Sequence, residues 1–507
     1  MSEYLVDIQH ERLSFFTPAG EVKALNDVSI HLNDGEVLGI VGESGSGKSV
    51  TAYSLMGLTA YPGKLVGGTI DFNGHRINDL SEKEFRKIRG NEVSIIFQDP
   101  MTSLNPVYTI GNQIMEVILL HTDKNKEQAR ARAKELLELV GINEPEKRLK
   151  QYPHELSGGM RQRVMIAIAL ACEPKLLIAD EPTTALTKKE VSALFKIILK
   201  LKEQGIAILF ISHKLDEVFE ISDRFTIFRD GELVATGSTK ELDDKKFTYY
   251  MTGREFSDNI FVPKNVSDKP VFELKHLTLN GSFSDINLSL RRGEILGITG
   301  LLDSGRTELG LSMFGLKPAD SGQIIKDGKE IKLTSPREAI ANSIGYVPED
   351  RLSEGLFLTQ SIGDNIIISE IDKLKKKNGQ FDLKKRDEEI EKWVKELEIK
   401  TKNPNNPATT LSGGNQQRIV LAKWLACNLD VLILNGPTVG VDIGSKHDIH
   451  MVLQRLANQG LGVIIISDDL PEVIQNCSRV LVIKNGKIKS EYDTQNVSEQ
   501  MIIDDMM

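Results

Sequence analysis

The sequence predicts an α/β protein built from two copies of one domain, each with a mainly parallel sheet, an antiparallel β portion and a helical subdomain. Three observations lead to this fold class. Short motifs recur at a constant offset of about half the chain, the main apolar runs are continuous rather than alternating, and a glycine-rich pattern directly follows one of them. Continuous apolar runs are typical of buried parallel strands, and a long period indicates a duplicated domain.

The repeat is clearest in a pair of LSGG motifs. LSGGMRQR begins at Leu156, and LSGGNQQR begins at Leu411, 255 residues later. The runs LLIADEPT and LILNGPT recur at the same offset, as do ILFISHKLDEV and IIISDDLPEV. We therefore expect one domain at residues 1–253, a second at 271–507 and a short polar linker at 254–270, which carries two prolines.

The elements of each copy follow from local patterns. The apolar runs VLGIVG, KLLIA and AILFIS, and later EILGITG, VLILN and GVIIIS, predict parallel strands that helices cover on both faces. Asn-Gly and Asp-Gly pairs at 73–74, 230–231, 327–328 and 485–486 predict hairpins. Charged stretches at about 105–155 and 360–410 predict the helical subdomains, and the lysine-rich run at 373–392 is expected to be a solvated helix face.

The composition excludes several classes of protein. The chain has 507 residues, of which 40% are hydrophobic and 27% charged, so it is not largely disordered, a coiled coil or collagen-like. Its longest apolar stretches are shorter than the roughly 20 residues of a membrane-spanning helix, and the N-terminus shows no signal-peptide pattern. Three scattered cysteines favour neither a disulfide framework nor a zinc site. A net charge of −9 without a long basic run argues against nucleic acid as a partner.

A complete phosphate-binding loop stands in the first copy. Residues 42–49 read GESGSGKS, which fits the G-x4-G-K-[ST] pattern and follows a predicted strand, so each copy is expected to be a P-loop NTPase domain. Its glycines let backbone N–H groups close around phosphate oxygens, and the next helix points its positive end at them. We expect Lys48 to reach the β- and γ-phosphates of ATP and Ser49 to hold Mg²⁺. The nucleotide-binding residues predicted here are Gly42, Ser44, Gly45, Gly47, Lys48 and Ser49.

Four polar residues that follow strands would complete this site. Asp180 ends an apolar run, where its carboxylate can reach Mg²⁺, and Glu181 is placed to orient and polarise the attacking water. Gln98 could contact both Mg²⁺ and water, and His213 ends the next strand, within reach of the γ-phosphate. We predict that Glu181, His213 and Gln98 are catalytic and that Ser49, Gln98 and Asp180 hold the metal.

Phe15 has two interpretations. It lies 27 residues before the phosphate-binding loop and could stack on the adenine base. It could equally be an aromatic residue of the core.

The LSGG motifs predict a second anion site in each copy. Ser157 and Ser412 are placed to cap helices, and the glycines after them expose backbone N–H groups at the positive end of each helix. The residues concerned are Ser157, Gly158 and Gly159, and Ser412, Gly413 and Gly414. One P-loop domain does not need two such sites. The pattern is explained if the P-loop of one copy and the LSGG of the other close on a single nucleotide.

The second copy has lost groups that hydrolysis needs. Its loop GLLDSGRT at 300–307, where Gly305, Arg306 and Thr307 are the predicted binding residues, carries arginine in place of lysine. Arginine binds phosphate as a planar fork rather than as a point charge. Asn435, Gly436, Glu349 and Asp468 stand, in that order, where the first copy has Asp180, Glu181, Gln98 and His213. Losing one positioned base costs about 10²- to 10⁴-fold in rate, so one site is expected to hydrolyse and the other to bind at most.

These motifs together resemble the ATP-binding-cassette (ABC) ATPases with two nucleotide-binding domains in tandem. In layout the chain is most similar to the ATPase subunits of bacterial ribose/galactose-type sugar importers. The resemblance lies in the short linker, in a second P-loop that ends Gly-Arg-Thr, in YVPEDR at 346–351, in LSGGNQQR and in ISHKLDEVFEISDR at 211–224. That family generally keeps Asp-Glu where this chain has Asn435 and Gly436.

The first part of the chain departs from that resemblance. From about 1 to 186, GIVGESGSGKSVTAYSLMGL, IFQDPMTSLNP and YPHELSGGMRQRVMIAIALACEPKLLIADEPTTAL resemble the oligopeptide/dipeptide importer ATPases. The segment after Gln98 is where such ATPases dock their membrane partner, so the docking surface of the first copy is expected to be peptide-like and that of the second sugar-like.

The resemblance implies that the two domains pair head-to-tail. The first P-loop would then be completed by Ser412–Gly414 and Asp442 of the second copy, and the second P-loop by Ser157–Gly159. It further implies ATP and Mg²⁺ as cofactors, integral membrane permease subunits as partners, an indirect extracytoplasmic substrate-binding protein, and a peripheral place on the cytoplasmic face of the membrane.

The function that follows is the ATP-hydrolysing subunit of a bacterial importer, for monosaccharides before peptides. A soluble tandem ABC protein acting on ribosomes or DNA is the alternative, although the linker of about 17 residues is short for the first and the cysteines are too few for the second. A third possibility is a recombined or artificial chain that folds but couples to nothing.

Overall fold

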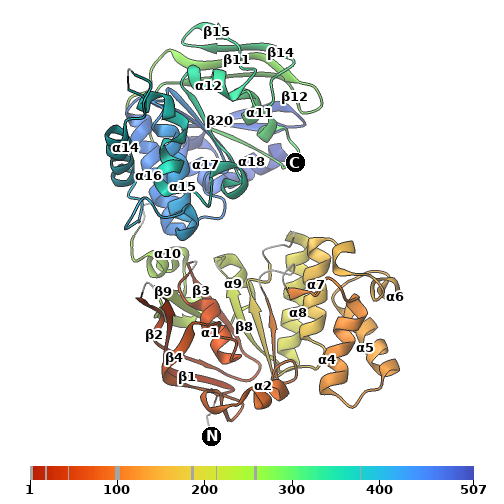
Figure 1. The fold of residues 1–507 in the computed structure, drawn as a ribbon. Helices are drawn as coiled ribbons and strands as arrows, with labels where there is room; N and C mark the ends of the chain where they lie inside the picture. The colour runs from red at the N-terminus through yellow and green to blue at the C-terminus, as the bar shows by residue number, and fades with distance from the viewer. Residues whose placement is uncertain are drawn as a thin grey trace. The chain divides into compact units, whose positions relative to one another are not determined.

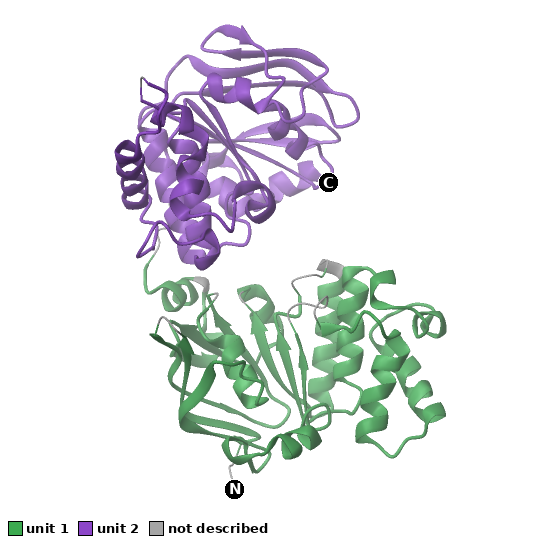
Figure 2. Ribbon diagram, viewed as in Figure 1, with its two compact units in different colours: residues 1–256 green, residues 257–507 purple. Residues whose placement is uncertain are grey.

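The computed structural model describes residues 4–17, 20–43, 45–97, 103–183, 186, 188–212, 214–255, 260–376 and 378–507. The chain divides into two compact units, unit 1 (residues 1–256) and unit 2 (residues 257–507), which are coloured separately in Figure 2. Among the described helices, none has the length and apolar content that crossing a membrane requires.

Unit 1 contains two sheets and the helices around them (Figure 1). Its strands are β1 (Val6–Thr17), β2 (Gly20–Leu32), β3 (Val37–Gly42), β4 (Gly63–Phe72), β5 (His75–Arg76), β6 (Val93–Ile96), β7 (Leu176–Asp180), β8 (Ala207–Ser212), β9 (Arg224–Arg229) and β10 (Glu232–Ser238). Its α-helices are α1 (Lys48–Leu55), α2 (Glu82–Ile88), α4 (Ile110–His121), α5 (Lys126–Leu139), α6 (Pro145–Arg148), α7 (Gly158–Ala169), α8 (Lys188–Glu203), α9 (Leu215–Ile221) and α10 (Asp244–Thr252).

Unit 2 repeats this series of elements. Its strands are β11 (Pro270–Leu279), β12 (Phe283–Arg291), β13 (Ile295–Gly300), β14 (Ser321–Lys326), β15 (Lys329–Ile331), β16 (Ile344–Val347), β17 (Val431–Asn435), β18 (Gly462–Ile466), β19 (Arg479–Lys484) and β20 (Lys487–Asp493). Its α-helices are α11 (Arg306–Met313), α12 (Pro336–Ala341), α13 (Ile362–Ile367), α14 (Leu383–Glu396), α15 (Gly413–Leu425), α16 (Ile443–Asn458), α17 (Leu470–Asn476) and α18 (Glu499–Met506).

The main sheets of the two units have the same topology. The order is β10-β9-β3-β8-β7-β6 in unit 1, and the corresponding strands of unit 2 run β20-β19-β13-β18-β17-β16. All neighbours in these sheets are parallel except the hairpins β9-β10 and β19-β20. The predicted α/β fold with a duplicated, mainly parallel sheet is confirmed, and the shared topology places the carboxyl ends of the parallel strands along one edge in each unit.

Smaller antiparallel sheets complete the β structure. They run β2-β1-β4-β5 in unit 1 and β12-β11-β14-β15 in unit 2. The helices α4 to α7 lie at the end of unit 1 away from its antiparallel sheet (Figure 1). The structure therefore has the antiparallel portion and the helical subdomain that the hairpin signals and charged stretches predict.

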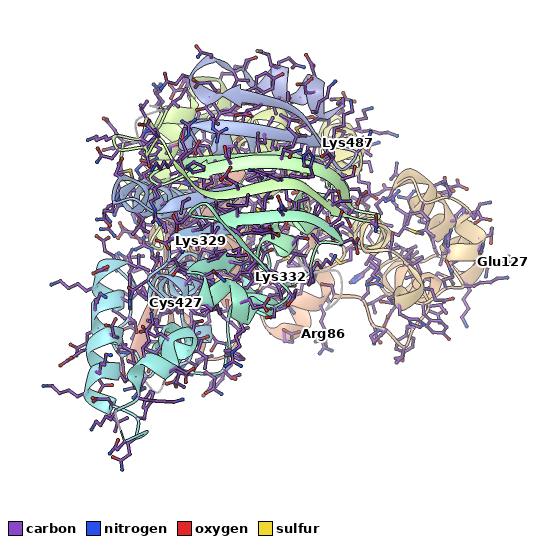
Figure 3. The ribbon with its side chains drawn as sticks, turned by 90° about the horizontal axis from the view of Figure 1, so that it is seen from above. Arg86, Glu127, Lys329, Lys332, Cys427 and Lys487 are labelled. Atoms are coloured by element: carbon purple, nitrogen blue, oxygen red, sulfur yellow. The ribbon has the colours of Figure 1, made fainter. Side chains whose placement is uncertain are left out.

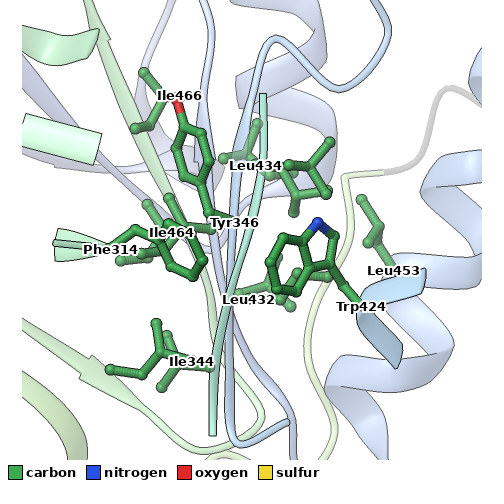
Figure 4. Packing of buried hydrophobic residues seen from close by; sticks show 14 of the residues in the cluster. Phe314, Ile344, Tyr346, Trp424, Leu432, Leu434, Leu453, Ile464 and Ile466 are labelled. Atoms are coloured by element: carbon green, nitrogen blue, oxygen red, sulfur yellow. The ribbon is translucent and has the colours of Figure 1, made fainter. Parts of the chain in front are cut away.

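The core of unit 2 illustrates why the strands are continuous apolar runs. Phe314 stacks on Tyr346, with ring centroids 5.5 Å apart, and meets Trp424 edge-on at 5.3 Å (Figure 4). Leu432 and Ile464 of the neighbouring strands β17 and β18 are fully buried in the same cluster. Apolar side chains on both faces of these strands are thus removed from water, which is the main force that holds the sheet to its helices.

The lysine-rich run of unit 2 is solvated, as predicted. In α14 only Ile390 and Trp393 are buried, and the helix presents its charged side chains to solvent. Charged side chains elsewhere, such as Glu127 in unit 1 and Lys329 and Lys487 in unit 2, are likewise exposed and point outward (Figure 3).

The second half of the predicted linker packs on unit 2. The Phe261 amide donates a hydrogen bond of 2.8 Å to the Gln475 carbonyl, and the Ser267 amide donates one of 3.0 Å to the Arg292 carbonyl. The chain then enters β11 at Pro270.

Candidate nucleotide sites

The loop between β3 and α1 has the backbone of a phosphate-binding loop. Gly47 precedes α1 with φ of 105°, in the left-handed region that other residues rarely adopt. A Cβ atom there would lie 2.6 Å from the Leu25 side chain and 3.0 Å from the Ala24 carbonyl oxygen. Both conformation and packing therefore require glycine. Gly42 and Gly45 lie on the same loop, whereas Ser44 lies outside the described residues.

Lys48 is buried at the start of α1. Its Nζ donates hydrogen bonds to the carbonyl oxygens of Gly42 (2.7 Å) and Glu43 (2.9 Å). Burial lowers the pKa of this ammonium, and the negative charges of Glu181 and Asp180 oppose that shift. The ammonium is therefore held between the loop that would cradle phosphates and the carboxylates at the end of β7.

Ser49 and Asp180 meet at the predicted metal position. Ser49 Oγ donates to Asp180 Oδ1 over 2.9 Å, and the Tyr53 hydroxyl donates to the other carboxylate oxygen over 3.0 Å. Burial raises the pKa of Asp180, which is 1% exposed. A serine hydroxyl beside a carboxylate is the oxygen pair that Mg²⁺ favours next to a bound triphosphate, so the residues of unit 1 fit the ion. The motifs did not single out Tyr53.

Glu181 follows β7 directly, as predicted, and its backbone is strained. It has φ of 47°, unusual for a residue with a side chain, and its amide donates to the Ile211 carbonyl of β8 over 2.9 Å. Strain of this kind is found where a fold fixes the direction of a functional side chain. The turn holds Glu181 at the carboxyl edge of the sheet, next to Asp180.

Two other predicted catalytic residues, Gln98 and His213, lie outside the described residues. The strands before them are described: β6 ends at Ile96, and β8 ends at Ser212. Because β6, β7 and β8 are parallel neighbours, these strands end at the edge where Glu181 begins its turn.

Glu217 connects two of these strand ends and was missed by the motif analysis. Its Oε2 atom accepts hydrogen bonds from Thr183 Oγ1 (2.9 Å) and Ser212 Oγ (2.8 Å), and its Oε1 atom accepts one from Lys214 Nζ (3.0 Å). All but Lys214 are buried. The carboxylate therefore ties the segment after Glu181 to the end of β8.

The same network exists in unit 2. Glu472 accepts hydrogen bonds from Thr438 Oγ1 (2.8 Å) and from Ser467, and it is also paired with buried His450 at 3.2 Å. Glu217 and Glu472 are 255 residues apart, so the repeat offset is the signal that could have revealed them.

Phe15 lies in β1, half-buried against the core of unit 1. It pairs with Val22 of β2 and Gly63 of β4. Phe16 beside it is 44% exposed, and the Lys64 ammonium lies 6.0 Å from its ring centroid. The partial burial of Phe15 is compatible with both interpretations of this residue.

The first LSGG motif starts α7. Ser157 caps the helix, as predicted, by accepting a hydrogen bond of 3.4 Å from the Met160 amide. A Cβ atom on Gly159 would lie 2.5 Å from the Glu190 carboxylate, whereas Gly158 has open space beside it. Arg163 pairs with the same carboxylate at 2.9 Å.

The second LSGG motif starts α15 and differs in its contacts. Ser412 occupies the cap position, but its hydroxyl accepts from the Asn415 side chain (3.0 Å) instead of a backbone amide. The Arg351 guanidinium lies close to Gly413 and donates to the Val439 carbonyl over 2.8 Å. The Arg351 guanidinium thus lies beside the second LSGG, whereas the ion pair of Arg163 and Glu190 lies beside the first.

Asp442 caps α16 by accepting a hydrogen bond of 2.7 Å from the Ser445 amide. Its other carboxylate oxygen lies 3.2 Å from the position of a Cβ atom on Gly414, so it faces the LSGG backbone of its own unit.

The second P-loop keeps its backbone but has a different cation. Gly305 precedes α11 with φ of 92°, as Gly47 precedes α1. Arg306 is 4% exposed, and its Nη2 atom lies 3.4 Å from Asp468 Oδ2, just beyond β18. Thr307 follows it, half-buried. The two residues that replace Lys48 and His213 thus form an ion pair.

In unit 2 the aspartate that ends β7 and the glutamate after it have no acidic counterpart. Asn435 ends β17, is buried and shares a side-chain hydrogen bond with Tyr346. Gly436 has φ of 56°, and its amide donates to the Ile466 carbonyl over 2.8 Å. The turn of Glu181 is therefore preserved without its side chain. These residues do not fit Mg²⁺ as Ser49 and Asp180 do.

The fold, the P-loop and the helix that starts at LSGG define an ATP-binding cassette, present twice. A profile of the ABC transporter family matches residues 25–184 and 283–439. The ribose import ATP-binding protein RbsA of Bacillus licheniformis is 36% identical over 493 residues, covering 96% of this chain and 97% of that protein. The xylose import ATP-binding protein XylG of Brucella abortus is 37% identical over 515 residues, covering 99% and 98%.

A solved dimeric ATP-binding cassette bound to ADP and Pi is also similar, at 28% identity over 46% of this chain and 98% of that chain, with a TM-score of 0.43. The family match and the relatives place the chain plainly: it belongs to the ABC transporter family, as an ATPase with two cassettes. The predicted resemblance to the sugar-importer ATPases is confirmed, while the peptide-like character of residues 1–186 stays a prediction.

Proposed function

We propose that this chain is the ATP-hydrolysing subunit of a bacterial monosaccharide importer and that only unit 1 supplies the catalytic residues. The 2.9 Å contact between Ser49 Oγ and Asp180 Oδ1 supports the proposal most, because this oxygen pair, next in sequence to Lys48 and Glu181, is suited to hold Mg²⁺. The relatives named as ribose and xylose import proteins, which match almost the whole chain, support the sugar as cargo.

Hydrolysis follows from the positions of the residues in unit 1. Lys48 exchanges the loop carbonyls for the β- and γ-phosphates of ATP, and the loop amides bind the remaining phosphate oxygens. Ser49, Asp180 and Gln98 would hold Mg²⁺, which would supply positive charge to offset that of the phosphates. Glu181 orients the water for in-line attack and accepts a hydrogen bond from it, which makes the water oxygen a better nucleophile. His213, the next residue in the sequence after β8, would contact the γ-phosphate.

The two cassettes pair head-to-tail in this proposal. ATP at the first P-loop is covered by Ser412, Gly413 and Gly414 of unit 2, and the second P-loop by Ser157, Gly158 and Gly159 of unit 1. Each unit has an LSGG helix start in addition to its P-loop, and this supports the choice. Arg351 and Asp442 lie beside the LSGG that would cover the intact site, and the ion pair of Arg163 and Glu190 lies beside the LSGG that would cover the degenerate site.

In this proposal the opening and closing of the cassettes is coupled to separate membrane subunits. ATP clamps the cassettes together, hydrolysis lets them part, and integral membrane permease subunits convert the movement into transport of sugar delivered by an extracytoplasmic binding protein. The chain would then lie on the cytoplasmic face of the membrane as a peripheral protein, and nucleic acid would not be a partner.

Co-expression with candidate permeases tests the proposal. We expect the chain to co-purify with a sugar-type permease, and we expect the sugar-loaded binding protein to stimulate ATPase activity of that complex in vesicles. Stimulation by a peptide-type permease and binding protein would assign the cargo to the peptide-like first part of the chain. Co-sedimentation with ribosomes and no permease partner would contradict an importer role.

A further inference from the structure

The P-loop of unit 2 contains a buried cation with unused hydrogen-bond donors. Arg306 is 4% exposed, and within the described part of the chain its Nε and Nη1 atoms have no hydrogen-bond partner. Buried guanidinium donors are rarely left unpaired, so a group that is present only with ligand is expected to accept from them.

The position of this guanidinium identifies the kind of ligand. Arg306 starts α11 directly after Gly305, where the loop amides and the helix dipole attract anions. Its Nη2 atom reaches Asp468 at the carboxyl end of β18. The guanidinium therefore lies between the P-loop and the strand end, where the terminal phosphates of a nucleotide bound to this loop would lie.

The pair of a hydroxyl and a carboxylate that would hold Mg²⁺ is incomplete at the same place, because Thr307 keeps the hydroxyl but Asn435 replaces the carboxylate. Asn435 has no charge, and its side chain is engaged with the Tyr346 hydroxyl. Glu349, which stands where unit 1 has Gln98, is exposed, and its side chain lies 3.1 Å from the position of a Cβ atom on Gly436. Asp468 is already paired with the arginine.

We propose that the P-loop of unit 2 binds a nucleoside di- or triphosphate without Mg²⁺, with the Arg306 guanidinium in the place of the ion. The inference rests on the proposed function, because it assigns the state of the second nucleotide site of that ATPase. Arginine suits this role since it stays charged at any working pH and offers a fork of donors to two phosphate oxygens at once.

Asp468 acts as a stand-in for phosphate in this arrangement. Its side chain is 70% exposed, and the ion pair at 3.4 Å is the contact it makes with the guanidinium. Because Asp468 is mostly exposed, water can solvate its carboxylate once an incoming phosphate has taken its place beside the buried guanidinium. Nucleotide exchange at this site then needs no metal to dissociate.

The test measures ATP binding to the full-length chain in which Lys48→Ala has disabled the first P-loop. Photolabelling with 8-azido-ATP, followed by peptide mapping, shows which unit carries the nucleotide. We expect label in unit 2 and an ATP affinity that changes less than about threefold between excess Mg²⁺ and excess EDTA. Adding Arg306→Ala should weaken binding about tenfold or more in both conditions, as expected for lost charge-assisted hydrogen bonds.

Asn435→Asp in the same Lys48→Ala chain is the matched control variant, and it is expected to gain Mg²⁺-dependent ATP binding. It restores the carboxylate that Asp180 provides in unit 1, so Mg²⁺ should now tighten ATP binding about tenfold. This variant keeps the guanidinium, and its answer does not depend on whether the Arg306→Ala chain folds.

Two results would overturn the inference: tenfold tighter binding with Mg²⁺ in the Lys48→Ala chain, or no label in unit 2 under either condition. The proposed function is judged separately, by Mg²⁺-dependent ATP hydrolysis of the unmodified chain. Hydrolysis without metal-free binding in unit 2 would reject the inference alone, and absence of hydrolysis would reject the proposed function.

Discussion

The Ser49 hydroxyl donates a 2.9 Å hydrogen bond to the Asp180 carboxylate and so joins the first turn of α1 to the last residue of β7. These residues are far apart in the sequence, and the sheet brings them together because β3 and β7 both pair with β8. In unit 2 the corresponding residues are Thr307 and Asn435. The two units therefore share this scaffold, but an uncharged amide replaces the carboxylate of the pair in unit 2.

Asp180→Asn should convert the metal site of unit 1 to the chemistry of unit 2. Loss of the carboxylate removes a Mg²⁺ ligand, so we expect ATPase turnover to fall about 10²-fold or more, with far higher Mg²⁺ needed for the remainder. Steady-state rates over a Mg²⁺ titration measure both effects. An unchanged Mg²⁺ requirement would mean that Asp180 does not hold the metal.

Ser412→Arg should stop hydrolysis, since a bulky cation at the start of α15 would keep that helix from the phosphates at the first P-loop. We expect a loss of about 10²-fold or more, as for removal of groups that stabilise transition-state charge. Ser157→Arg is the matched control and should cost less, because it obstructs the site that does not hydrolyse. Equal losses in the two variants would contradict the head-to-tail assignment.

Glu217→Gln should slow turnover without changing ATP affinity much. The carboxylate ties Thr183 and Ser212 together, so a weaker network lets the ends of β7 and β8 shift, and misplacement of catalytic groups costs about tenfold or more. Glu472→Gln makes the same change in unit 2 and should leave kcat close to normal. If both variants lose turnover alike, Glu217 has only a structural role.

Glu11 should make the stability of unit 1 depend on pH. Burial raises the pKa of this carboxyl to about 7 from an ordinary 4.5. The folded state therefore keeps a proton that the unfolded state releases, and the free energy of unfolding falls as pH rises from about 4.5 to about 7. The fall is at most about 3 kcal/mol, and Glu11→Gln should remove it.

Unfolding followed by two probes tests this pH dependence. Both tryptophans, Trp393 and Trp424, belong to unit 2, so their fluorescence reports that unit, whereas circular dichroism reports both. We expect Glu11→Gln to change the pH dependence of unfolding when it is followed by circular dichroism but not when it is followed by tryptophan fluorescence. A circular-dichroism transition of the unmodified chain that stays constant between pH 5 and pH 8 would show that Glu11 ionises normally.

Most of the fold could be predicted because its signals are local. The run VLGIVG before GSGKS predicts β3, the P-loop and α1 together, and the 255-residue offset carries that prediction to β13 and α11. The cap of α15 shows the limit of such reasoning. Ser412 stands at the predicted cap position, but its hydroxyl accepts a hydrogen bond from the Asn415 side chain instead of a backbone amide.

The contacts that complete the sites were not predictable from motifs. Tyr53 and Asp180 are 127 residues apart, and Arg306 and Asp468 meet only because β13 and β18 are neighbours in the sheet. Such pairs depend on the register of packed elements, and no local pattern records them. Predictions for Gln98, His213 and Ser44 concern residues outside the described part of the chain.

The central claim is that one cassette hydrolyses ATP, and Glu181→Gln tests it most directly. This change leaves the P-loop, Lys48 and the metal ligands in place but removes the carboxylate that directly follows Asp180 at the end of β7. The account predicts that the full-length variant binds ATP with near-normal affinity while turnover falls by about 10²- to 10⁴-fold. Turnover at half the normal rate or more would show that unit 2 hydrolyses ATP and would contradict the account.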